Sequence, residues 1–287
     1  MRNDELGTMN DELKTTCFHS SFIVPNSSFI SMGTYQVQPE NAHGDERAEF
    51  ERQQAEILAR RVELTHPVFS YILLGSLLAV FLCQLAVGEA QSVYAAGLVK
   101  PLAREGEFWR LLTAATLHGG FLHIYFNGQA LYNIGSTIEA LSKRSHVPIC
   151  FLLSAIGGSF ASLYLMPNGL PSIGASGGIM GLFGFLGIFG YRNKQHLPPG
   201  FIRNIIINLL LIAGLGLIAY AYIDNAAHGG GLVVGTIYGL LTIRRNEAVE
   251  PKNASGFLNL LSYVSLLLVV AAALFSILRI LSFREIV

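Results

Sequence analysis

Seven long apolar stretches without Asp, Glu, Lys or Arg dominate the sequence after residue 66. They cover residues 68–87, 122–138, 147–166, 177–191, 205–223, 226–243 and 258–278. Most of them reach the ~20 residues that a helix needs to cross the ~30 Å hydrocarbon core of a bilayer. Because the bilayer core offers no water to backbone groups, these stretches are expected to be helices. The sequence therefore predicts an all-α polytopic membrane protein.

The composition supports a lipid environment. Charged residues make up 13% of the chain and hydrophobic residues 52%, whereas soluble domains carry roughly 25% charged residues. The formal net charge is zero, so nothing favours a nucleic-acid partner. Cys17, Cys83 and Cys150 are widely spaced and lack a C-x-x-C pattern. They are interpreted as incidental thiols, and neither a disulfide framework nor a zinc site is expected.

Basic residues between the stretches predict how the chain is oriented. One pair precedes the first stretch, and further pairs follow the second, fourth and sixth stretches. If successive stretches cross the membrane in opposite directions, all four pairs lie on the same side. That side should be cytoplasmic, and so should the polar N-terminal segment, residues 1–66. Arg279 and Arg284, near the end of the seventh stretch, fit this rule badly. No organelle-targeting signal is visible, so a bacterial cytoplasmic membrane is the expected location. The pairs are Arg60–Arg61, Lys143–Arg144, Arg192–Lys194 and Arg244–Arg245.

The fourth stretch is unusually short. Turn-forming residues 167–172 precede it, so its helix should begin near Gly177 and end near Arg192. About 15 residues at 1.5 Å each span roughly 22 Å, less than the hydrocarbon core. Ser176 should therefore lie below the outer surface. Irregular backbone at that depth is tolerated only where it is buried in protein or lines a wet cavity, which predicts a functional site.

Three polar residues are predicted to share one depth in the membrane. Ser176, His228 and Asn127 each lie 16 residues before a cytoplasmic cation. Their three helices run from outside to inside in the predicted topology, so these side chains should lie at one level. Polar side chains at membrane depth are candidate functional residues. The cations are Arg192, Arg244 and Lys143, respectively.

A serine and a histidine at one level suggest nucleophilic catalysis. Histidine can take the hydroxyl proton and so activate a serine near neutral pH. No carboxylate lies inside the apolar stretches, so we expect a dyad of Ser176 and His228 in place of a triad. The resulting oxyanion needs preorganised donors. His123 and Asn127, spaced i, i+4 on one helix face, and the Ser176 N–H at a helix start are the candidates.

Glycines predict close packing of the two helices that carry the dyad. Gly177, Gly181 and Gly184 form a stripe on the fourth stretch, and Gly231 and Gly235 share the face of His228. Small residues at this spacing let membrane helices approach backbone to backbone. Glycine is also frequent in membrane helices generally, so this pattern alone does not discriminate catalysis from packing.

Each candidate residue also has a plain structural interpretation. Ser176 could be only a helix N-cap, His228 a packed histidine, and Asn127 a polar bridge between helices. For His118 a supporting role is favoured over a catalytic one. Trp109 and Arg110 are interpreted as an interfacial anchor and a loop clamp, and Glu139 as an ion pair or cap at the end of a helix.

Taken together, these motifs resemble the rhomboid family. They occur in family order over roughly residues 68–245. Gly174-Ala-Ser176-Gly177 resembles the nucleophile motif G-x-S-G. The others are H-x4-H-x3-N at His118, His123 and Asn127; the base His228 with Gly231 and Gly235; Trp109-Arg110; and Gly135-x-x-x-Glu139.

The resemblance implies a rhomboid core of six transmembrane helices in residues 67–245. Residues 246–287 would then form a cytoplasmic linker and an additional seventh helix. It also implies a serine endopeptidase that cuts transmembrane protein substrates and needs no metal or cofactor. Met180 departs from the family pattern, since many members carry an aromatic residue there, beside the histidine.

Two other functions compete with proteolysis. A transporter or channel could use a broken helix and buried His and Asn residues, but it predicts an internal repeat, and only one shortened helix is visible. A rhomboid-like protein that binds clients without cutting them usually lacks the serine or the histidine. Ser176 and His228 are both present, which favours the protease.

Overall fold

The computed structural model describes residues 42–219, 223–245 and 254–284. Within these residues the fold is helical and contains no sheet; Leu98 and Ser172 form an isolated antiparallel bridge. The predicted all-α class is therefore confirmed. Residues 1–41, which include Cys17, and residues 246–253 lie outside the described residues. The helices are α1 (Ala42–Leu64), α2 (Val68–Val87), α3 (Glu89–Ala96), α4 (Lys100–Arg104), α5 (Arg110–Thr113), α6 (Phe121–Leu141), α7 (His146–Leu165), α8 (Ser176–Arg192), α9 (Phe201–Ile218), α10 (Asn225–Thr242) and α11 (Gly256–Arg284), with short 3-10 turns η1 (Ala114–Thr116) and η2 (Lys194–His196).

Each apolar stretch of the sequence corresponds to one helix, namely α2, α6, α7, α8, α9, α10 or α11, although residues 220–222 of the fifth stretch lie outside the described residues. Four of them, α2, α7, α9 and α11, are long and apolar enough to cross a membrane. Among the helices that extend past the predicted ends, α9 begins at Phe201 and α11 continues to Arg284. Both extensions take in an arginine, Arg203 or Arg279, at which the apolar stretch had been ended.

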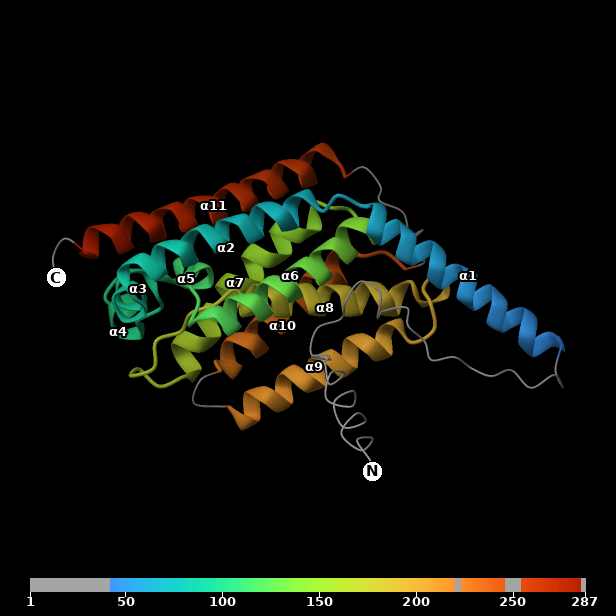
Figure 1. Ribbon diagram of the computed structural model, residues 1–287, viewed down its shortest axis with the longest axis horizontal. Helices are drawn as coiled ribbons and strands as arrows, with labels where there is room; N and C mark the ends of the chain where they lie inside the picture. Colours follow the sequence, from blue (N-terminus) through green and yellow to red (C-terminus); the bar gives the residue numbers. More distant parts are fainter. Residues whose placement is uncertain (1–41, 220–222, 246–253, 285–287) are drawn as a thin grey trace, which may run out of the picture.

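The helices form an elongated bundle (Figure 1). α8 lies in the middle and packs against α7 and α10. α11 runs beside α2 along one side, and α9 lies on the opposite side. The short helices α3, α4 and α5 gather at one end, while α1 projects from the other. α6 and α8 both begin near the end that holds α3 to α5.

Backbone contacts between α8 and α10 hold the centre of the bundle together. A Cβ atom on Gly231 would lie 2.0 Å from the carbonyl oxygen of Gly177, and one on Gly235 would lie 2.0 Å from that of Gly181. Only glycine permits such an approach, which is the packing expected of small residues at this spacing.

Glu139 joins the ends of α6 and α2. Its carboxylate accepts hydrogen bonds from the Ser70 N–H at 2.9 Å, the Ser70 hydroxyl at 2.7 Å and the Phe69 N–H at 3.3 Å. These are first-turn donors of α2, which have no partner inside their own helix. Gly135 lies one turn earlier, and a Cβ there would meet the Ser70 hydroxyl oxygen at 2.2 Å. Gly135 and Glu139 therefore act together to dock α2 on α6, so Glu139 caps a neighbouring helix rather than its own.

Glu139→Gln is expected to lower the free energy of unfolding by about 1–3 kcal/mol, because an amide offers one acceptor oxygen where the carboxylate offers two. Thermal unfolding in detergent micelles would measure the loss. Glu105→Gln is the matched control, since Glu105 is exposed and lies outside this contact. Equal melting temperatures for the two variants would show that the cap contributes nothing.

Candidate functional site

Ser176 is the first residue of α8. The chain enters the helix through Gly174, whose φ of +123° is rarely adopted by residues with a side chain. The Gly174 N–H donates to the carbonyl oxygen of Ala114 at 2.9 Å, which ties this entry to η1. The Ser176 side chain remains half-buried. The helix start is thus held by neighbouring backbone while the hydroxyl stays accessible.

His228 lies in the first turn of α10, close to the start of α8. The Gly177–Gly231 backbone contact brings the two helix starts together, since each glycine follows its candidate residue by three positions or fewer. His228 also lies within electrostatic range of Asp224 and His123. Among the described residues, neither Ser176 nor His228 has a side-chain hydrogen bond. Catalytic hydrogen bonds are often long before substrate binds.

His123 and Asn127 face the backbone that precedes Ser176. A Cβ on Gly174 would lie 2.8 Å from His123 Nε2 and 3.6 Å from Asn127 Nδ2. His123 Nδ1 accepts a hydrogen bond from the Gly119 N–H at 3.2 Å, so the neutral ring carries its proton on Nε2. Asn127 is 7% exposed, and its Nδ2 has no partner among the described residues. Two free donors therefore point toward the entry to α8.

His118 lies behind His123, outside the helices. Its main chain is bound twice by the Gln84 side chain of α2, with its N–H donating at 2.9 Å and its carbonyl accepting at 3.1 Å. The rings of His118 and His123 pack edge to face with centroids 5.1 Å apart. Burial, and secondarily the nearby His123, lowers the pKa of His118 to about 3. A neutral ring packed under His123 fits the supporting role.

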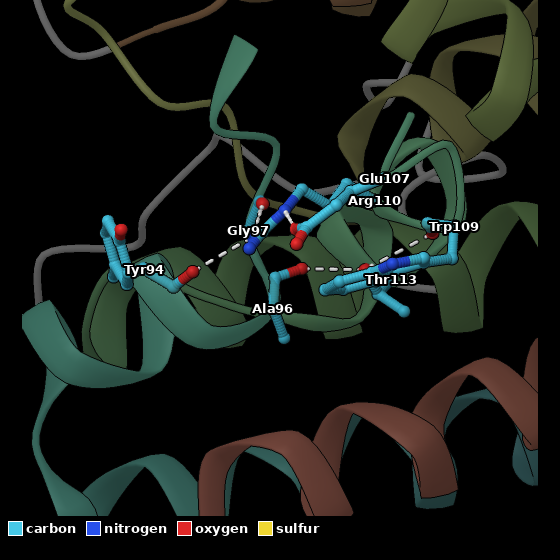
Figure 2. Close-up of polar contacts among 7 residues, drawn as sticks. All are labelled: Tyr94, Ala96, Gly97, Glu107, Trp109, Arg110 and Thr113. Carbon is cyan, nitrogen blue, oxygen red and sulfur yellow. Dashed lines mark hydrogen bonds and ion pairs between the residues drawn. The ribbon is translucent and has the colours of Figure 1, made fainter. Parts of the chain in front are cut away.

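Arg110 organises the segment between α2 and α6, as Figure 2 shows. Its Nη1 donates to the carbonyl oxygens of Tyr94 at 2.9 Å and Gly97 at 2.7 Å, and its Nε pairs with Glu107 at 2.5 Å. Thr113, on the same short helix, donates to the Ala96 carbonyl at 2.7 Å. These contacts are those of the loop clamp inferred from the sequence.

Trp109 connects that segment to α11. Its ring packs edge to face on Phe275 with centroids 5.1 Å apart, and the Arg279 guanidinium lies 5.4 Å from the Trp109 centroid. Next to it, the hydroxyls of Thr116 and Ser276 are 2.9 Å apart. Arg279, which fitted the charge rule badly, is thus held against an aromatic ring.

Comparison with known proteins places this chain in a family. Residues 105–245 match the model of the rhomboid domain. The chain is 34% identical over 173 residues to the rhomboid protease GluP of Bacillus subtilis, which covers 59% of this chain and 34% of that relative. It is 31% identical over 147 residues to the putative rhomboid protease YdcA of Bacillus subtilis, which covers 50% of this chain and 71% of that relative. The chain belongs to the rhomboid family.

The matched rhomboid domain contains every predicted site residue, from His118 to Gly235. α2 and α11 lie outside the matched range. RHOMBOID-like protein 4 of Arabidopsis thaliana is also similar, 30% identical over 189 residues that cover 60% of this chain and 46% of that relative. The rhomboid chain described here spans a third to a half of the length of GluP and RHOMBOID-like protein 4.

Two residues of this rhomboid site were missed by the sequence analysis. Asp224 immediately precedes α10 and accepts from the Ala227 N–H at 2.9 Å. An acidic residue before a helix is a usual N-cap signal, so Asp224 could have been found. Gln84 could not, because its partner His118 lies 34 residues away. Within the described residues, no group of three His, Cys, Asp or Glu side chains could hold a metal ion.

Proposed function

We propose that this rhomboid is an intramembrane serine endopeptidase that hydrolyses peptide bonds in or near transmembrane segments of membrane proteins. Ser176 acts as nucleophile and His228 as general base in a dyad. One observation carries the proposal: the backbone contact of Gly177 with Gly231 brings together the first turns of α8 and α10. Those turns carry the serine and the histidine, one on each helix.

In the proposed reaction, the Ser176 hydroxyl attacks the scissile carbonyl while His228 takes its proton. His228 then protonates the leaving amine, and water hydrolyses the acyl-enzyme. The oxyanion is stabilised by the His123 Nε2–H, the Asn127 amide and the Ser176 N–H. The tautomer of His123 supports this role, because the Gly119 N–H occupies the other ring nitrogen.

The proposed topology extends the four apolar helices to seven membrane spans. α2, α6, α7, α8, α9 and α10 form the six-helix core within residues 67–245, and α11 is the seventh span within residues 246–287. α6 and α10 are less apolar by composition because they carry the glycines and polar site residues described above, while α8 is short, with 17 residues. Residues 1–66 lie in the cytoplasm, and the bacterial cytoplasmic membrane is the proposed location.

The test is cleavage of a reporter that carries one transmembrane segment, in cells, by wild type, Ser176→Ala and His228→Ala at matched expression. Both variants are expected to lose the product, with rates reduced by at least about 10³-fold. A serine-reactive fluorophosphonate should label purified wild type but not Ser176→Ala. Ser76→Ala serves as the control, since Ser76 lies in α2 and its hydroxyl donates to the Ile72 carbonyl of its own helix.

The outcomes separate the remaining functions. Cleavage that survives Ser176→Ala would refute the assigned nucleophile. A wild-type protein that binds reporters, fails to cut any of them and takes no label would support a non-catalytic rhomboid-like binder in place of the protease.

A further inference from the structure

Asp224 occupies a junction between three parts of the site. It precedes α10, and its carboxylate oxygen Oδ1 accepts from the Ala227 N–H at 2.9 Å. Its main-chain oxygen accepts from the His228 N–H at 3.1 Å. These two bonds would by themselves make an ordinary N-cap, for which one side-chain oxygen suffices.

The second carboxylate oxygen has other partners. Oδ2 accepts from the hydroxyl of Ser172 at 2.6 Å and also from the hydroxyl of Ser162. Ser162 belongs to the last turn of α7 and is fully buried. Ser172 belongs to the segment that leads into α8, and its backbone is fixed by two hydrogen bonds with Leu98, at 3.0 and 3.2 Å. A cap would not need these bonds, so the carboxylate also joins separate elements.

Ser172 and Asp224 lie at equivalent positions relative to the two residues of the proposed dyad. Ser172 lies four residues before Ser176, and Asp224 lies four residues before His228. Their hydrogen bond therefore links the two chain segments just before the nucleophile and the base. On the other side, Gly177 and Gly231 hold the same two helices in backbone contact. The separation of Ser176 and His228 is therefore constrained by one contact that precedes them in the chain and by another that follows them.

We infer that Asp224 and Ser172 form a positioning pair that sets the distance between Ser176 and His228. The inference rests on the proposed function and adds a residue pair that touches neither substrate nor reacting atoms. Glycine contact alone leaves the helix starts free to slide or splay, because the hydrogen bonds described between α8 and α10 lie at their other ends, where Arg192 donates to the carbonyls of Leu240 and Ile243. The Ser172–Asp224 bond removes that freedom at the level where the chemistry is proposed. Small displacements matter there, since misplacement by about 1 Å can cost roughly 100-fold in rate.

Ser162 provides a matched control within the same junction. It donates to the same oxygen as Ser172, but from α7, which carries no proposed catalytic residue. Ser162→Ala and Ser172→Ala thus remove equivalent hydrogen bonds from one carboxylate. Both are expected to lower the melting temperature similarly.

The experiment measures kcat, KM and melting temperature for full-length wild type, Ser162→Ala, Ser172→Ala and Ser172→Thr, with the single-span reporter and with fluorophosphonate labelling. Ser172→Ala is expected to lower kcat and the labelling rate by about tenfold while KM stays unchanged. Ser162→Ala should keep kcat within about twofold of wild type. Ser172→Thr restores the hydroxyl and should recover most of the lost kcat. Asp224→Ala, which removes every side-chain hydrogen bond of Asp224, should lower both kcat and melting temperature.

Equal kcat values for Ser172→Ala and Ser162→Ala would overturn the positioning role and leave Asp224 as a structural cap. Failure of the proposed function is distinguishable, because Ser176→Ala would then cleave and label like wild type whatever residue stands at position 172. A loss of kcat in Ser172→Ala that threonine reverses, at unchanged KM, would establish the pair.

Discussion

Gly231→Ala and Gly235→Ala are expected to lower the free energy of unfolding by about 3 kcal/mol each and to abolish cleavage. In each case the new methyl group would lie 2.0 Å from a backbone carbonyl oxygen of α8. Backbone cannot rotate away as a side chain can, so α8 and α10 must separate. Thermal unfolding in micelles and reporter cleavage would measure the two effects.

Gly229→Ala makes the same substitution in the same helix, but we expect it to leave the free energy of unfolding unchanged or to raise it. Gly229 is in the same helix, but a Cβ there would have no neighbour within 4 Å. Alanine is favoured over glycine inside a helix by up to about 1 kcal/mol, so this variant should be as stable as wild type or more stable. If Gly229→Ala and Gly231→Ala melt at one temperature, the described contact of α8 with α10 is wrong.

Gly174→Ala is expected to reduce cleavage by roughly 100-fold or more. Its Cβ would lie 2.8 Å from Nε2 and Cε1 of His123, so the ring or the entry to α8 must move. That displaces a proposed oxyanion donor relative to Ser176. The rate of fluorophosphonate labelling would fall with the rate of reporter cleavage.

Gly106→Ala is the matched control for backbone strain. Gly106 has a φ of +115°, close to the +123° of Gly174, but no atom lies within 4 Å of its Cβ position. Both variants should therefore carry a similar cost of backbone strain, about 1–3 kcal/mol, to which Gly174→Ala adds its contact with His123. Only Gly174→Ala should lose activity. Equal activity losses would mean that the contact with His123 does not matter.

Much of this fold could be predicted because the membrane imposes a local signal. An apolar stretch must be helical in lipid, so seven helices follow from the absence of charge. The helix ends were less certain, since Arg203 and Arg279 continue helices that the charge criterion had ended. The prediction that Asn127, Ser176 and His228 share one depth in the membrane needed only their equal spacing from basic residues and the rise per residue of a helix.

Other features depend on contacts that no local pattern encodes. The short helices α3 and α5 are held together by Arg110 and Thr113, which donate to carbonyl oxygens more than ten residues away. Asp224 was treated as a boundary between two apolar stretches, so its bond to Ser172, 52 residues away, escaped notice. Hydrogen bonds between residues far apart in the chain leave little trace in the local sequence pattern, which is why these links required the structure.

The contact of α11 with Trp109 and Thr116 has a consequence for biogenesis. Ser276 and Thr116 are 160 residues apart in the chain, so their hydrogen bond closes one of the longest loops in the molecule. Such non-local contacts form late, after the intervening chain is in place. During synthesis, the segment that precedes His118 and His123 can gain this support only after α11 has left the ribosome. Maturation of this end of the bundle is thereby coupled to the synthesis of α11.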